Sequence, residues 1–227
     1  MSTGLIYLIA ALAFGASYLV KRHLKRTYRK WSAVPNSFGV TGAQTAEAIL
    51  KERGITHVEI QRVRGKLTDH YDPVKDILRL SKSNHGQTSV AAMAVSAHEA
   101  GHALQDASND LSLRLRRFLV PAAALGSRFG PMVAILGFTL GSGTLLRIGV
   151  LLLASMMIFQ IATLPVEINA SRKAMASLER LGLTDPAQRA GVQKVLTAAA
   201  LTYVAAAATS IAYFATLFAR GRGRFVA

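Results

Sequence analysis

The sequence predicts a membrane protein of the α+β class, in which transmembrane helices accompany a small domain with a short antiparallel sheet. Apolar residues make up 51% of the 227 residues, and the mean hydropathy is +0.31. The apolar residues gather in long runs with basic residues beside them. Between the runs lies a more polar segment with turn and helix-cap signals, which predicts the small domain.

The charge balance is strongly basic, with 27 Lys and Arg against 12 Asp and Glu. Positive charge beside apolar runs is explained by attraction to anionic lipid headgroups and by the bias of Lys and Arg toward cytoplasmic loops. The sequence has no basic patch interleaved with aromatic residues, so we expect a lipid bilayer and no nucleic acid as partner. Zero cysteines exclude disulfides, cysteine-ligated zinc and thiol catalysis.

Residues 1–20 are expected to form an N-terminal transmembrane anchor. The apolar part of this segment is followed at once by the basic residues of 21–30. A signal peptide would carry its charges before the apolar part, so we interpret the segment as uncleaved. Its C-terminal end should then face the cytoplasm.

Two further apolar regions predict a transmembrane helical hairpin over residues 118–166 and a C-terminal membrane helix with a basic tail over 191–227. The hairpin should turn near residues 141–143, or at Arg147 if the first span begins as early as Phe118. Four full spans would leave the basic tail outside, against the charge bias. The last helix is therefore either a span that overrides this bias or a re-entrant or packed helix.

A cytoplasmic domain is expected over residues 21–117, with a second cytoplasmic segment over 167–190. Thr41 and Gln44 fit a capping box, which predicts the start of a helix that ends at Gly54.

The pattern that follows predicts a strand over residues 58–63 and a β-hairpin between Leu67 and Leu80 with its turn at Asp72-Pro73. A helix should then run from Ser89 to Ala107. The exposed edge of such a sheet can pair with an extended peptide, and the alternative role of the hairpin is scaffolding.

The most informative motif is His98-Glu99-Ala100-Gly101-His102, in the second half of this helix. Two histidines four residues apart lie on one face of a helix, so one Zn²⁺ can bind both. Glu99 lies close to the same face, near enough to take a proton from a water at the metal. This spacing is the signature of zinc metalloproteases, and a sheet followed by such a helix is the order found in zincins.

A catalytic zinc site has three protein ligands and one open position. Glu167 is the best candidate for the third ligand, because it follows an apolar run and a carboxylate at the end of a membrane helix needs a partner. The alternative is an interfacial glutamate paired with Arg172 or Lys173.

Three stretches, SVAAMAVSAHEAGHALQDA, LTDHYDP and TLPVEINASRKA, resemble signature segments of the neutral zinc metallopeptidase family, the YugP-type membrane proteins of bacteria. The resemblance covers about residues 36–210. It implies a membrane-bound peptidase with a zincin-like fold of the gluzincin kind, one Zn²⁺ as cofactor and a multi-pass location in the bacterial inner membrane.

The resemblance also implies site residues, with His98, His102 and Glu167 as ligands and Glu99 as general base. Related gluzincins often carry an aspartate four residues after the ligand glutamate. The sequence has a serine at that position, so Asn169 or Ser171 would have to orient the histidines. The candidates for a donor that stabilises the oxyanion are Tyr203, His70, Tyr71 and His85.

The expected substrates are peptides or membrane proteins, cleaved near the cytoplasmic membrane surface. One alternative is a non-proteolytic membrane scaffold or assembly factor that keeps zinc for stability. Another is an intramembrane protease, but the apolar stretch before the motif, residues 90–97, is too short to cross a membrane.

Overall fold

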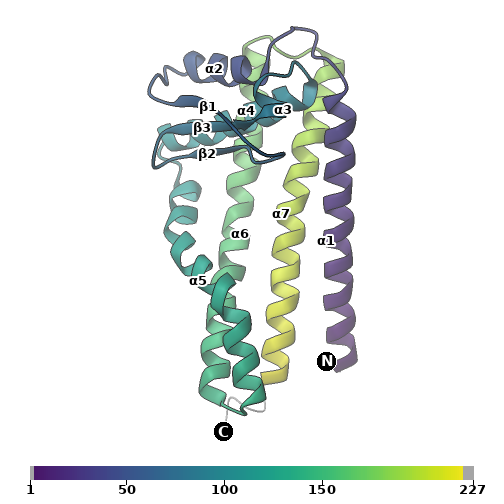
Figure 1. Cartoon of the computed structure of the whole chain (residues 1–227), viewed down its shortest axis with the longest axis vertical. Helices are drawn as coiled ribbons and strands as arrows, with labels where there is room; N and C mark the ends of the chain where they lie inside the picture. Colours follow the sequence, from purple (N-terminus) through teal and green to yellow (C-terminus); the bar gives the residue numbers. More distant parts are fainter. Residues whose placement is uncertain (1–2, 222–227) are drawn as a thin grey trace. The chain divides into compact units, whose positions relative to one another are not determined.

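The computed structural model describes residues 3–221, and within them the chain forms seven helices and three strands (Figure 1). The chain separates into two compact units. The helical unit comprises residues 1–21, 114–164 and 201–227, and the mixed unit comprises residues 22–113 and 165–200. The helices are α1 (Thr3–Ser32), α2 (Gly42–Glu52), α3 (Lys82–His85), α4 (Val90–Ala107), α5 (Leu111–Thr139), α6 (Gly143–Arg180) and α7 (Pro186–Gly221), and the strands are β1 (Glu59–Val63), β2 (His70–Asp72) and β3 (Ile77–Ser81).

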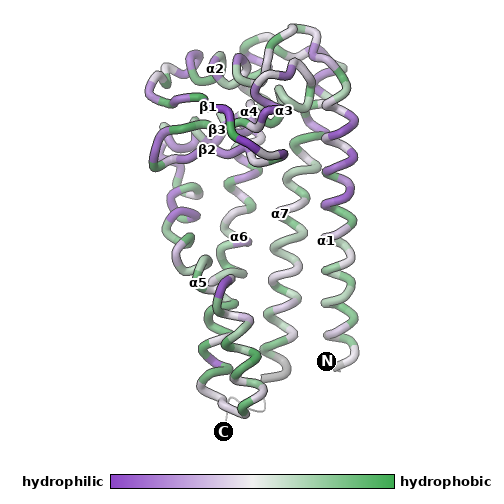
Figure 2. Tube along the Cα trace, viewed as in Figure 1, coloured by the Kyte–Doolittle hydropathy of each residue, from purple (hydrophilic) through white to green (hydrophobic). Residues whose placement is uncertain are grey.

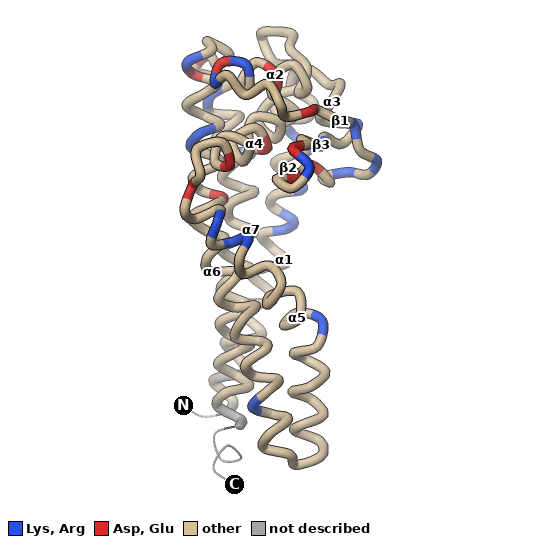
Figure 3. The backbone as a smooth tube through the Cα atoms, turned by 90° about the vertical axis from the view of Figure 1, so that its left-hand side faces the viewer, with Lys and Arg blue, Asp and Glu red and all other residues tan. Residues whose placement is uncertain are grey.

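Three helices among the described residues are long and apolar enough to cross a membrane: α5, α6 and α7. The hydrophobic colour dominates their segments in the helical unit (Figure 2). The sequence of this unit contains no Asp or Glu, so all 12 acidic residues belong to the mixed unit (Figure 3). The absence of acidic residues from the sequence of the helical unit is expected for helices in a membrane, because a charged side chain in hydrocarbon costs free energy.

In the helical unit, α5 and α6 form a close-packed hairpin. The chain turns at Gly141, in the left-handed conformation with φ +67°, which is the first of the two predicted positions. A Cβ atom at Gly137 would overlap the backbone of Leu146, and one at Gly149 would overlap the backbone of Ala134. Small residues at these contacts let the two backbones approach closely, as is common between helices in lipid.

The helices extend further than the apolar pattern predicts. Helix α1 continues through the whole basic segment to Ser32, and α6 passes through Pro165 and ends only at Arg180. Helix α7 begins at Pro186, where the Gln188 N–H donates to Asp185 Oδ1 at 2.8 Å. Much of the segment predicted over 167–190 is therefore helical. The basic tail at 222–227 and the first two residues of the anchor lie outside the described residues.

The mixed unit holds a three-stranded sheet in the order β1-β3-β2. Strand β2 is antiparallel to β3, as expected for a hairpin, but β1 is parallel to β3, so the prediction of an antiparallel sheet is wrong. The chain leaves β1 and crosses to the far side of β3 before β2 begins. Leu67, with φ 55°, lies in this crossing, and the hairpin strand begins at His70. Strand periodicity specifies the faces of a strand and not its neighbours.

The predicted helix starts of the mixed unit are confirmed. The Thr41 N–H donates to Gln44 Oε1 at 2.8 Å, and the Gln44 N–H donates to Thr41 Oγ1 at 3.2 Å, which completes the capping box of α2. Helix α2 ends at Glu52, and Gly54, with φ +67°, follows two residues later. The Ala92 N–H donates to Ser89 Oγ at 3.1 Å at the start of α4. These caps satisfy backbone donors that the first helical turns cannot pair.

The core of the mixed unit lies between α2, β3, α4 and the parts of α6 and α7 in this unit. Ile49, Leu78, Leu80, Met93 and Leu178 are fully buried there. Burying each such side chain contributes about 1.5–3 kcal/mol to stability. The core fixes the position of α4, the helix that carries the two motif histidines.

We expect Gly42→Ala to lower the free energy of unfolding by about 1–3 kcal/mol, because the added methyl group would overlap the Asn84 carbonyl and Ser96 Oγ. Thermal unfolding of the full-length protein in detergent measures the effect. Gly86→Ala is the matched control, since a Cβ at that position has no atom within 4 Å. Equal stability of the two variants would contradict the close packing at Gly42.

Candidate metal centre

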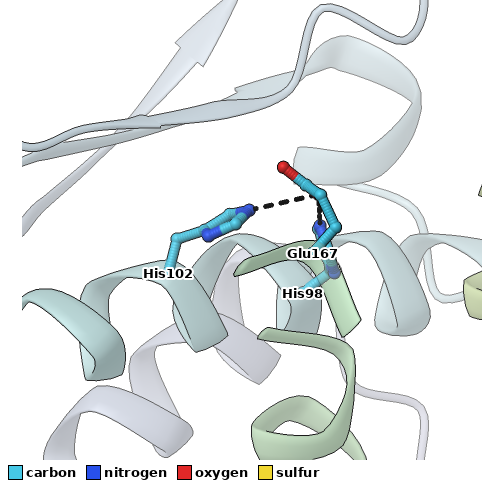
Figure 4. Close-up of side chains that lie close together, drawn as sticks. All are labelled: His98, His102 and Glu167. Carbon is cyan, nitrogen blue, oxygen red and sulfur yellow. Dashed lines mark hydrogen bonds and ion pairs between the residues drawn. The ribbon is translucent and has the colours of Figure 1, made fainter. Parts of the chain in front are cut away.

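The mixed unit brings His98, His102 and Glu167 together (Figure 4). The two histidines come from successive turns of α4, and the glutamate comes from α6. Their candidate ligand atoms all lie within 4.8 Å of one another. Glu167 Oε2 lies 3.1 Å from His98 Nε2 and 3.6 Å from His102 Nε2. The carboxylate is 2% exposed, so the histidines are its neighbours inside the protein.

This donor set fits zinc in its chemistry and its size. Two imidazole nitrogens and one carboxylate oxygen are a common ligand set of catalytic zinc sites. A tetrahedral ion with ligand distances of about 2.0–2.1 Å separates its ligand atoms by about 3.3 Å. The two nitrogen–oxygen distances, 3.1 and 3.6 Å, lie on either side of that value. The donor atoms and the two nitrogen–oxygen distances therefore fit a zinc ion.

Helices α4 and α6 approach closely because α4 has a glycine at their contact. A Cβ atom at Gly101 would overlap the carbonyl oxygen of Ala170. Next to this contact, Gln105 Nε2 donates to the Val166 carbonyl at 2.9 Å. Further along, Asn169 Nδ2 donates to Asp110 Oδ2 at 2.7 Å. These contacts hold the turn of α6 that carries the glutamate against the motif helix.

Glu99 lies beside the three candidate ligands and is 8% exposed. Its Oε2 accepts a hydrogen bond of 3.1 Å from the backbone N–H of Tyr71, on the edge strand β2. Burial raises the pKa of Glu99 to about 7, the nearby carboxylates of Glu167 and Asp69 raise it as well, and His98 opposes them. A carboxyl group with a pKa near neutrality is suited to accept and release a proton at neutral pH.

The phenol of Tyr71 is directed to carboxylates and not to the candidate ligands. Its hydroxyl lies 3.0 Å from Asp106 Oδ2 and 3.2 Å from Asp76 Oδ1. Burial raises the pKa of this phenol, and the two carboxylates raise it further. The side chain is therefore protonated and tied to the end of α4 and to the β2–β3 turn, while the backbone N–H holds Glu99.

The remaining predicted site residues lie in different places. Ser171 Oγ lies 3.1 Å from His98 Nδ1, so this serine does contact a motif histidine. Asn169 donates instead to Asp110 and so anchors α6 to the start of α5. His70 is exposed on β2, and its Nδ1 lies 2.9 Å from the Thr68 carbonyl. Two oxyanion candidates remain predictions: His85 lies at the end of α3, and Tyr203 belongs to the helical unit.

The sequence interpretation missed Gln105. This side chain is fully buried, and its Oε1 lies 2.9 Å from Nδ1 of His102. A signal for it was present, because residues three apart on a helix lie on neighbouring positions of one face. A large amide in a helix otherwise rich in alanine, three residues after a motif histidine, indicates a hydrogen-bond partner for that ring.

The described residues combine three helices that are long and apolar enough to span a membrane with a largely buried His-His-Glu cluster that could hold a metal ion. Residues 6–221 match the family described as "Putative neutral zinc metallopeptidase". The chain is 39% identical over 221 residues to the "Putative membrane protease YugP" of Bacillus subtilis (strain 168), and the alignment covers 96% of this chain and 98% of that protein. No solved structure matches the chain. The chain therefore belongs to this zinc metallopeptidase family, as its resemblance indicated.

The raised pKa of Glu99 predicts a pH-dependent stability of the metal-free protein. Because burial disfavours the carboxylate, the stability is fully present below the ordinary pKa of 4.5 and is lost as the pH rises through about 7. At about pH 8 the loss amounts to about 3 kcal/mol. We expect Glu99→Gln to remove this loss, so the variant should be more stable than the wild type at about pH 8 and similar to it in acid.

Thermal unfolding across this pH range, with a chelator present, measures the difference. Glu47→Gln removes the same charge from an exposed position on α2 and is the control. A wild-type protein whose stability relative to Glu99→Gln does not change with pH would contradict the raised pKa.

Proposed function

We propose that this protein is a membrane-bound zinc metallopeptidase that hydrolyses peptide bonds with a water activated at zinc. The observation that carries the proposal is the convergence of His98, His102 and Glu167 within 4.8 Å, with a buried carboxyl group, Glu99, beside them. Family membership supports the same chemistry. The three clustered side chains would hold the zinc, which supplies Lewis acidity and lowers the pKa of a bound water toward neutrality.

Glu99 is the proposed general base. It accepts the proton of the attacking water and then delivers it to the departing amine. The hydrogen bond from the Tyr71 N–H holds one carboxylate oxygen and so orients the group. Strand β2 lies at an edge of the sheet, which supports the view that an extended peptide lies along this strand over the metal.

We place the site near the cytoplasmic surface of the bacterial inner membrane. Glu167 lies on a helix whose preceding segment is apolar enough to span a membrane, so the ligand follows directly on a candidate span. The basic residues that follow the apolar part of α1 favour a cytoplasmic location for the mixed unit. Peptides or membrane proteins that reach this surface are the proposed substrates.

We expect Glu99→Gln to lower peptide hydrolysis by about 10²–10⁴-fold while zinc binding is kept, because only the proton acceptor is lost. Turnover of a quenched fluorescent peptide library and metal analysis of the same purified sample measure the two effects. Glu47→Gln is the control for loss of a negative charge. Full activity of Glu99→Gln would contradict the assigned base.

The same variant separates a peptidase from a zinc-stabilised scaffold or assembly factor. Cells that carry Glu99→Gln should accumulate defined uncleaved proteins that wild-type cells lack, since a scaffold needs no proton acceptor. Quantitative proteomics of the two strains measures this. Identical proteomes in strains that contain equal amounts of zinc-loaded protein would favour the scaffold.

We expect Glu167→Ala to lower zinc affinity by tens of fold or more, because one of three ligands is removed. Equilibrium titration of the purified protein with zinc against a competing chelator measures it. Glu179→Ala is the matched control: this glutamate also lies on α6, is exposed, and pairs with Arg189. Unchanged zinc content in Glu167→Ala would exclude this glutamate as the third ligand.

Labelling tests the surface location against an intramembrane site. The chain has no cysteine, and Ala107 is exposed at the end of the motif helix, so Ala107→Cys introduces a single thiol. We expect a membrane-impermeant maleimide to label this thiol in inverted membrane vesicles and not in intact cells. Failure to label in either preparation would place the site inside the membrane.

A further inference from the structure

We infer that Gln105 is a positioning residue that fixes the tautomer of His102 and ties this ligand to the turn of α6 that carries Glu167. The inference rests on the proposed function, since it concerns the same metal centre. It assigns a role to a residue that lies outside the set of three candidate ligands and one base.

Gln105 makes one hydrogen bond on each side of its amide group. Its Nε2 donates to the carbonyl oxygen of Val166 at 2.9 Å, and its Oε1 lies 2.9 Å from His102 Nδ1. The side chain is 0% exposed, so neither bond competes with solvent. Val166 directly precedes Glu167 in α6. One amide thus links a candidate ligand on α4 to the backbone beside a candidate ligand on α6.

The backbone carbonyl determines how the amide is oriented. A carbonyl oxygen can only accept, so the NH₂ end of Gln105 must face Val166. The amide oxygen then faces His102 Nδ1, and an oxygen that can only accept requires Nδ1 to carry the proton. A flipped amide would place two carbonyl oxygens 2.9 Å apart without a proton between them. The neutral ring therefore has its lone pair on Nε2, the nitrogen that lies 3.6 Å from Glu167 Oε2.

The second histidine has no such constraint in its contact with Ser171. Ser171 Oγ lies 3.1 Å from His98 Nδ1, and a hydroxyl group can donate or accept. This contact orients the ring of His98 and permits either tautomer. The two candidate ligands of α4 therefore differ, since Gln105 prepares His102 for metal binding and Ser171 leaves the proton of His98 free to move.

Full burial makes Gln105 a positioning residue and not a catalytic residue, because a side chain without exposed surface touches no substrate. Its effect must pass through the histidine and through the spacing between α4 and α6. Partners of this kind typically change metal affinity by about 10–100-fold when they are removed.

The test compares wild type with Gln105→Met, which keeps an unbranched chain of similar length and removes both hydrogen bonds. Gln188→Met is the matched control, because Gln188 is also a buried glutamine of the mixed unit, and its amide bonds to Ser37. All three full-length proteins are purified in detergent with ¹⁵N-labelled histidine and stripped of metal. The first readout is the pair of imidazole ¹⁵N shifts of His102 at alkaline pH, assigned with His102→Gln. The second is the dissociation constant for Zn²⁺.

We expect the wild type and Gln188→Met to show the Nδ1-protonated tautomer of His102, and Gln105→Met to show a mixture of both tautomers. Zinc should bind about 10–100-fold more weakly to Gln105→Met than to Gln188→Met. A purely structural role would change thermal stability and leave the tautomer of the folded protein unchanged.

Two results would overturn the inference. One is a wild-type His102 protonated mainly on Nε2, which needs no variant and so holds even if Gln105→Met fails to fold. The other is an unchanged tautomer of His102 in folded Gln105→Met, whatever the zinc affinity. If the wild type binds no zinc but the tautomers behave as expected, the positioning role stands and the proposed function fails.

Discussion

The structure of the candidate site depends on the close approach of α4 and α6. Two histidines on one helix can hold a metal ion only weakly, and the third donor must come from another element. Glu167 reaches them because Gly101 has no side chain at the point where the two backbones meet. Burial makes this arrangement demanding, since a carboxylate away from water needs partners, and His98 Nε2, 3.1 Å from Glu167 Oε2, can donate a hydrogen bond to it.

Local periodicity was sufficient to predict the α4 half of the site. The helical repeat places His98 and His102 on one face, and the serine cap marks where that helix begins. Glu167 could be found from the sequence by a different argument, the cost of a carboxylate at the end of an apolar run. Both arguments use physical costs that act within a few residues, and the structure brings the three side chains together.

Features that depend on partners distant in the sequence were harder to predict from the sequence. The parallel pairing of β1 with β3 depends on which side of the hairpin the chain crosses, and alternation of apolar residues carries no information on that choice. The same limit applies to Asn169, which is two residues after Glu167 on α6 but bonds to Asp110. Gln105 was visible as an unusual residue, yet its acceptor on α6 was not.

The contact at Gly101 also restricts which sequences can use this construction. Glycine in the middle of a helix costs about 1 kcal/mol relative to alanine, so its presence needs a compensating gain. Here the gain is the short distance between the two helices. A methyl group at Gly101 would meet the Ala170 carbonyl and so increase this distance. A relative with a larger side chain there would have to separate its two helices and recruit its third donor from elsewhere. The residue at this position therefore distinguishes family members that can share this ligand geometry from family members that share only the histidine spacing.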